Sequence, residues 1–227
     1  MKLRERIGKS KILGGAVADR GVRALLLFIG SFAVNIFIAC VNAAAGILYS
    51  SIWYGALAVY YIVLTLQKGI FLGTLRNTKK KYAEDEARYR REVTKIYIAN
   101  GAILLFLQAA LTAAIVQMVT TEKPAQTGMV IAIANAAYSF FKITVAIVNL
   151  VKTVRMQNAV LQTIRNINFV DALVSILALT STLICTFGDF SSMRATLIFT
   201  AVAVSIAVIA VGVTMIVKGA LRLKRLE

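Results

Sequence analysis

Long apolar runs, separated by short polar segments, make up most of the chain. A helix needs about 20 predominantly apolar residues to cross a membrane, because each residue adds about 1.5 Å toward a hydrocarbon core of about 30 Å. The runs do not alternate between polar and apolar positions, as the strands of an outer-membrane barrel do. Runs of sufficient length occupy residues 24–48, 52–73, 96–120, 128–151, 160–187 and 194–217. The pattern therefore predicts an all-α polytopic membrane protein with six transmembrane helices.

Positively charged residues are divided very unevenly between the two sides that these spans define. Of the 26 Lys and Arg residues, 22 fall in the N-terminal segment, the segment after the second span, the link between the fourth and fifth spans, or the C-terminal tail. This count assigns Lys68 to the segment after the second span. The opposite side has Lys123 and Arg194. Because an excess of Lys and Arg marks the cytoplasmic side, both termini are expected in the cytoplasm.

Composition agrees with a membrane protein. The sequence is 59% hydrophobic, its mean hydropathy is +0.77 and its formal net charge is +16. Such a charge can indicate a nucleic-acid partner, but here the basic residues lie between the apolar runs. We expect basic cytoplasmic segments at 1–23 and 218–227, with anionic lipid head groups as their partners and no nucleic acid. The expected location is the cytoplasmic (inner) membrane of a bacterium.

Residues 77–95 form a polar segment between the second and third spans, with charges of both signs. One interpretation is a surface for a partner protein or for lipid. The other is a solvated helical extension of the third span, in which Glu84 and Arg88 pair across one turn. We prefer the second interpretation, because mixed charges at helical spacing are typical of a solvated helix.

Three stretches resemble the transmembrane domain of the cation diffusion facilitator family of metal–proton antiporters. SFAVNIFIACVNAAAGILYSSIWYGALAVYYIVL is similar to that family's first helical hairpin. RYRREVTKIYIANGAILL resembles the segment that enters its third helix, and NAVLQTIRNINFVDALVSI resembles its fifth helix. The resemblance covers nearly the whole chain. It implies a transporter fold of six spans with cytoplasmic termini, and a homodimer.

The family's transport site uses two side chains on the second helix and two on the fifth. By the resemblance, these positions fall on Tyr60, Leu64, Ile167 and Asp171. A zinc site needs Cys, His or carboxylate donors, and the sequence contains no histidine. Because three of the four positions lack such a donor, we expect a degenerate metal site with no metal and no other cofactor. Because only residues 218–227 follow the last predicted span, we expect the family's cytoplasmic metal-binding domain to be absent.

Two charged residues fall deep inside predicted spans. Asp171 lies on the order of 18 Å along the fifth span, and Lys142 roughly 15 Å from the cytoplasmic end of the fourth. A lone carboxylate at that depth is costly, so it should be paired, protonated or directed into a cavity. We therefore hypothesise that Lys142 pairs with Asp171. Such a pair has either a purely structural role or the role of a proton- or cation-responsive switch.

Amide side chains accompany these charges within the spans. Polar groups inside membrane helices usually face the bundle interior. They either line a hydrophilic path for substrate or ions or hold the helices together by hydrogen bonds. The candidate path comprises Asp171, Lys142, Tyr60, Tyr61, Asn35, Asn42 and Asn168.

Enzyme motifs are missing from the sequence. We find no phosphate-binding Gly-Lys-Ser/Thr loop, no His-Glu-x-x-His and no histidine to act with a Ser or Cys nucleophile. An enzyme is therefore not expected. Two hypotheses follow: a transporter-like protein for a cation or small solute that is not a standard zinc/proton antiporter, or a non-transporting membrane scaffold or partner subunit derived from the same fold. A water-accessible cavity that reaches Asp171 would favour the first.

Overall fold

Five long helices form most of the described part of the protein. The computed structural model describes residues 20–48, 52–120, 129, 133, 136–144, 146, 159–188 and 190–225. Its helices are α3 (Arg20–Leu48), α4 (Ile52–Lys81), α5 (Glu86–Thr120), α7 (Ala159–Phe187) and α8 (Phe190–Lys224). By length and composition, each of the five can cross a membrane. The prediction of a helical, multi-pass membrane protein is therefore confirmed.

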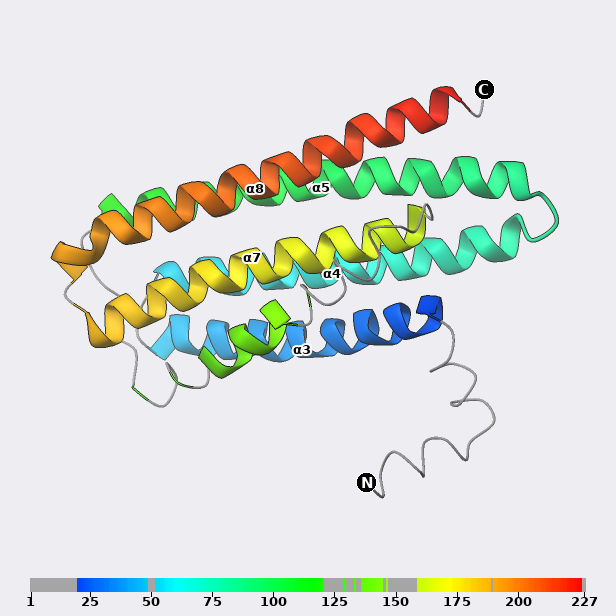
Figure 1. Ribbon diagram of the computed structural model, residues 1–227. Helices are drawn as coiled ribbons and strands as arrows, with labels where there is room; N and C mark the ends of the chain where they lie inside the picture. Colours follow the sequence, from blue (N-terminus) through cyan, green and yellow to red (C-terminus); the bar gives the residue numbers. More distant parts are fainter. Residues whose placement is uncertain are drawn as a thin grey trace, which may run out of the picture.

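The fourth predicted span, 128–151, falls largely outside the described residues. Within it, residues 136–144 are described and helical. This short helical piece lies beside α3 in Figure 1. It carries Lys142, whose side chain reaches α7.

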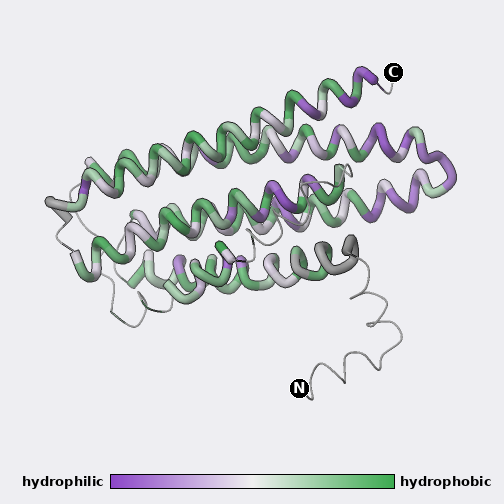
Figure 2. Tube along the Cα trace, in the orientation of Figure 1, coloured by the Kyte–Doolittle hydropathy of each residue, from purple (hydrophilic) through white to green (hydrophobic). Residues whose placement is uncertain are grey.

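The helices lie side by side along one axis, with α3, α5 and α7 running in one direction and α4 and α8 in the opposite one (Figure 1). Tight contacts join α3 to α4, α4 to α5, α5 to α8, and α7 to α8. The start of α3, the α4–α5 turn, the start of α7 and the end of α8 therefore share one end of the bundle. Figure 2 shows hydrophilic residues concentrated at the α4–α5 turn and the end of α8, and mostly apolar residues along the remaining length. We call this hydrophilic end the basic end.

Helix ends at the basic end differ from those predicted. Helix α4 continues to Lys81 rather than ending at 73, and α5 begins at Glu86 rather than 96. The helical extension of the third span is confirmed for residues 86–95, whereas residues 77–81 continue α4 and residues 82–85 form the turn. The predicted ion pair was wrong. Arg88 pairs with Asp85, at 3.2 Å between Nε and Oδ2, because Glu84 lies in the turn before the helix. Asp85 also accepts a hydrogen bond from the Arg88 backbone N–H at 3.0 Å, as an N-cap residue does.

The helices approach closely where glycine removes a side chain. A Cβ added to Gly46 of α3 would lie 3.0 Å from the backbone nitrogen of Gly55 in α4. A Cβ added to Gly101 of α5 would lie 2.9 Å from Cβ of Met215 in α8. Small residues at such crossings let helix backbones pack by direct van der Waals contact, which is the main attraction between helices in lipid.

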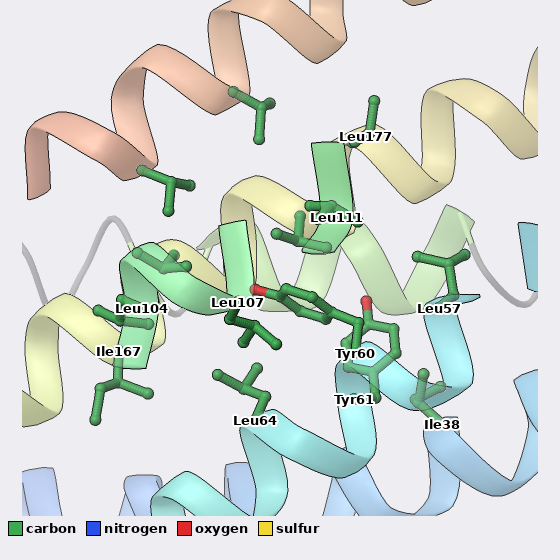
Figure 3. Packing of buried hydrophobic residues seen from close by; sticks show 14 of the residues in the cluster. Ile38, Leu57, Tyr60, Tyr61, Leu64, Leu104, Leu107, Leu111, Ile167 and Leu177 are labelled. Atoms are coloured by element: carbon green, nitrogen blue, oxygen red, sulfur yellow. The ribbon is translucent and has the colours of Figure 1, made fainter. Parts of the chain in front are cut away.

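An apolar core fills the centre of the bundle. Figure 3 shows Tyr60 and Leu64 of α4 packed with Leu104 and Leu107 of α5 and Ile167 of α7. Leu64, Leu104 and Ile167 are completely buried. The polar groups described next therefore lie against an apolar, close-packed wall, which lowers the effective dielectric constant around them.

Candidate functional site

A charged cluster surrounds Asp171 in the middle of the membrane-spanning bundle. Asp171 is 1% exposed and lies twelve residues into α7, roughly 18 Å from its start. Its Oδ2 accepts hydrogen bonds from Lys68 Nζ at 2.8 Å and from Asn35 Nδ2 at 2.9 Å. Its Oδ1 accepts a hydrogen bond from Lys142 Nζ. We call Lys68, Lys142 and Asp171 the charge cluster.

The predicted pairing of Lys142 with Asp171 is confirmed. The Lys142 ammonium also lies 4.9 Å from the ring centroid of Tyr61 and 4.9 Å from that of Tyr138. A cation within about 6 Å of an aromatic face is stabilised by the ring's electron density. Lys142 is therefore held on one side by a carboxylate and on others by two tyrosine rings.

Lys68 is the member of the cluster that the sequence interpretation missed. It was counted with the polar segment after the second span, yet its side chain is completely buried. Besides Asp171, its ammonium donates to Ser31 Oγ at 2.8 Å and lies 5.6 Å from the centroid of the Phe28 ring. The available signal was spacing: positions 60, 64 and 68 recur every four residues and so share one inward face of α4.

The positive and negative charges of the charge cluster are unequal in number. Two ammonium groups face one carboxylate, which leaves one uncompensated positive charge when both lysines are protonated. The other carboxylates among the described residues lie at the basic end, on Glu84, Asp85, Glu86 and Glu92. A charge in a low-dielectric interior is costly unless an opposite charge accompanies it. The arrangement therefore favours occupation of the site by an anion over occupation by a cation.

Other predicted site residues take different places. Asn35 joins the charge cluster, and Tyr138 donates a 3.4 Å hydrogen bond to its Oδ1. The Tyr61 hydroxyl lies 3.3 Å from Ser175 Oγ. Asn42 instead donates to the Ile38 carbonyl oxygen of its own helix at 2.8 Å. Of the residues predicted to line a path, Asn35 therefore contacts Asp171 directly, whereas Asn42 bonds within its own helix.

Tyr60 belongs to the apolar core. Its ring meets that of Tyr61 edge to face, with the centroids 5.6 Å apart, and its hydroxyl has no hydrogen-bond partner among the described residues. Leu64 and Ile167 lie in the same core (Figure 3). Three positions that the family resemblance assigns to metal ligands are thus packing residues. The described residues contain no group of three or more His, Cys, Asp and Glu side chains that could hold a metal.

A cavity of about 220 Å³ reaches the charge cluster from the side of the basic end. Its α3 and α7 residues precede Asn35 and Asp171 in sequence, and both helices begin at that end. Its lining comprises Leu26, Gly30, Ser31, Val34, Tyr138, Phe141, Lys142, Ala146, Asn168 and Asp171. Asn168 Oδ1 is buried without a hydrogen-bond partner among the described residues. The cavity is therefore apolar along most of its wall and polar where it meets the cluster.

A much smaller cavity, of about 10 Å³, lies on the other side of Asp171. Asn42, Tyr61, Ser139 and Thr182 give it polar walls. Tyr138 lines both cavities. The layer that separates them contains Tyr138, Tyr61 and the charge cluster, so the free volume beside the site is much larger on the side of the basic end than on the other side.

No protein-family model, no curated protein and no solved structure matches this chain. The function must therefore be inferred from the charge cluster and from the cavity that reaches it.

Proposed function

We propose that this protein is a transporter-like membrane protein for a small solute, and that the solute binds in the cavity beside Lys142 and Asp171. The observation that carries the proposal is the cavity itself, because a membrane carrier needs a polar site at mid-membrane depth that is open to one side at a time. The lining supports this reading, since ionisable side chains inside membrane proteins usually mark substrate or ion pathways. The resemblance to cation efflux proteins agrees with a transporter.

A metal cation is a poor substrate for this site. The oxygens of Asp171 already accept hydrogen bonds from two lysines and from Asn35. A divalent cation would have to displace both ammonium groups and would find no second carboxylate among the described residues of the cluster. Of the cation and small-solute alternatives raised by the sequence, the charge cluster supports the small solute.

The proposed orientation places the basic end in the cytoplasm. The excess of Lys and Arg at this end supports it, because such residues are retained on the cytoplasmic side. Residues 128–151 would supply the sixth crossing, and anionic lipid head groups would neutralise the basic end. The cavity would then open toward the cytoplasm, and the solute would enter or leave through it.

Flux into proteoliposomes tests the proposal. Purified protein is reconstituted, and uptake of radiolabelled small anions, neutral solutes and cations is compared with that of protein-free vesicles. We expect saturable uptake of at least one solute, lost in Lys142→Met and retained in Lys79→Met. Lys79 is the matched control, because it lies exposed in the last turn of α4, outside the cavity. Uptake that is unchanged in Lys142→Met would contradict the proposal and favour a non-transporting scaffold.

A further inference from the structure

The charge and shape of the cavity specify a class of ligand. We infer that it binds a small organic monoanion with an apolar body, whose anionic group lies beside Lys142. The inference rests on the proposed function in taking the cavity as a solute site, and it adds the chemistry of the solute. Three observations carry it: the excess positive charge, the segregated lining and the volume.

The excess charge comes first. Lys68 and Lys142 share one carboxylate, and an anion in the cavity would bring the cluster to neutrality. Asp171 repels such an anion weakly, because its oxygens are directed toward Lys68, Asn35 and Lys142. The Lys142 ammonium has three N–H donors, and its bond to Asp171 uses one. Lys142 lines the cavity and Lys68 does not, so Lys142 is the group that an anion would contact.

The lining is divided in the same way as an amphipathic anion. Near Asp171 the wall offers the Lys142 ammonium and the Ser31 hydroxyl, which already accepts from Lys68 and can donate its own proton, whereas the Tyr138 hydroxyl donates to Asn35 Oδ1. The rest of the wall is formed mainly by the apolar side chains of Leu26, Val34, Phe141 and Ala146. A fully hydrated inorganic ion would leave this apolar wall without a partner, whereas an organic body would fill it.

The volume limits the size of that body. The cavity holds about 220 Å³, below the roughly 300 to 1,000 Å³ of pockets for drug-sized ligands. A dry apolar cavity of about 150 Å³ is known to hold benzene. A single aromatic ring or short branched chain with one carboxylate therefore fits the space. We use benzoate as the probe for this class.

Three probes that share one ring and differ in charge test the inference. The full-length protein in detergent is titrated with benzoate, benzamide and benzylammonium, and its thermal unfolding is followed. We expect benzoate alone to raise the unfolding temperature in a saturable manner. At a concentration 100-fold above its Kd, it should shift the folding equilibrium by about 100-fold toward the folded state. Lys142→Met should weaken benzoate binding at least tenfold, and Lys79→Met should leave it unchanged.

A second variant keeps the test independent of the stability of Lys142→Met. Ala146 is 5% exposed and lines the apolar part of the cavity. Ala146→Leu fills space while leaving the charge cluster intact, so it should also weaken benzoate binding. Stabilisation by benzylammonium, equal stabilisation by all three probes, or no stabilisation by benzoate would each overturn the inference. The last result would mean that the excess charge is relieved by loss of a proton from a lysine instead.

Failure of this inference and failure of the proposed function give different results. Benzoate binding without flux of any solute would retain the anion site and remove the transporter. Flux that depends on Lys142, without anion binding, would retain the transporter and remove the anion site. Both experiments use the same wild-type and Lys142→Met proteins, so the two outcomes are directly comparable.

Discussion

The strongest test of the charge cluster is the substitution Asp171→Asn. It removes the one carboxylate of the cluster and leaves two buried ammonium groups, Lys68 and Lys142, facing each other across an amide. Removing one partner of a buried ion pair costs about 3–5 kcal/mol, because the remaining charge is left without compensation. Here two charges are left, so we expect the free energy of unfolding to fall by about 3–5 kcal/mol or more.

Two further variants of the charge cluster should affect stability much less than Asp171→Asn. Lys142→Met removes the excess positive charge and leaves the Lys68–Asp171 pair, with its 2.8 Å contact, electrically neutral. We expect the free energy of unfolding to change by less than about 1 kcal/mol, because the lost hydrogen bond is offset by relief of a buried charge. A triple variant, with Lys68 and Lys142 replaced by Met and Asp171 by Leu, removes the whole network. Such replacement of buried ion pairs by apolar residues is often neutral, or stabilises the folded state by about 1–4 kcal/mol.

Equilibrium unfolding in mixed detergent micelles measures the series. Fluorescence of Trp53, the sole tryptophan and a buried residue, reports tertiary structure, and circular dichroism reports helix content. The expected order of stability is Asp171→Asn far below the wild type, with Lys142→Met and the triple variant close to it. If Asp171→Asn unfolded within about 1 kcal/mol of the wild type, or if Lys142→Met cost as much as Asp171→Asn, the argument from uncompensated charge would be refuted.

Three further predictions concern packing, topology and the surface. Gly101→Ala should lower the free energy of unfolding by about 1–3 kcal/mol, because its Cβ would lie 2.9 Å from a side-chain carbon of α8. Gly73→Ala, whose Cβ would have nothing within 4 Å, should leave the free energy of unfolding unchanged. Equal effects of the two substitutions in the unfolding assay would contradict the close α5–α8 contact. A cysteine at Lys80, in a variant without native cysteines, should react with a membrane-impermeant thiol reagent only after the cells are opened, and labelling of intact cells would reverse the orientation. Glu86→Gln should change stability by at most about 0.5 kcal/mol, because its pair with Arg90 is exposed; a larger loss would indicate a partner for Glu86 besides Arg90.

The spans could be predicted from the sequence, because a membrane helix is specified by local length and hydropathy. Five predicted spans correspond to long helices, and the ends of α7 agree within one residue. The C-terminal end of α4 and the start of α5 were predicted too far inside, because hydropathy marks the edge of the lipid rather than the edge of the helix. Polar helices continue into water when capping groups such as Asp85 and charges such as Lys81 stabilise their ends.

The centre of the site could be predicted because of its depth. Asp171 and Lys142 were identified as partners because consecutive spans run antiparallel and place them at similar levels. Lys68 was missed because counting charges by side assigned it to a loop, although it falls within the predicted second span. Tyr138 and Ser31 gave no local signal. They reach the cluster through tertiary packing, which neither periodicity nor composition encodes.

The number of lysines bears most directly on the choice between a transporter and a scaffold. Among the described residues the bundle carries one buried aspartate, which needs one counter-charge, and Lys68 supplies it at 2.8 Å without lining the cavity. Lys142 is therefore surplus to neutrality, yet it lies deep in the bundle and lines the cavity. A purely structural role accounts for the first lysine but leaves the desolvation cost of the second without full compensation by the carboxylate it shares and the two tyrosine rings it faces. A ligand that supplies negative charge provides that compensation, so Lys142 favours a solute-binding protein over a scaffold.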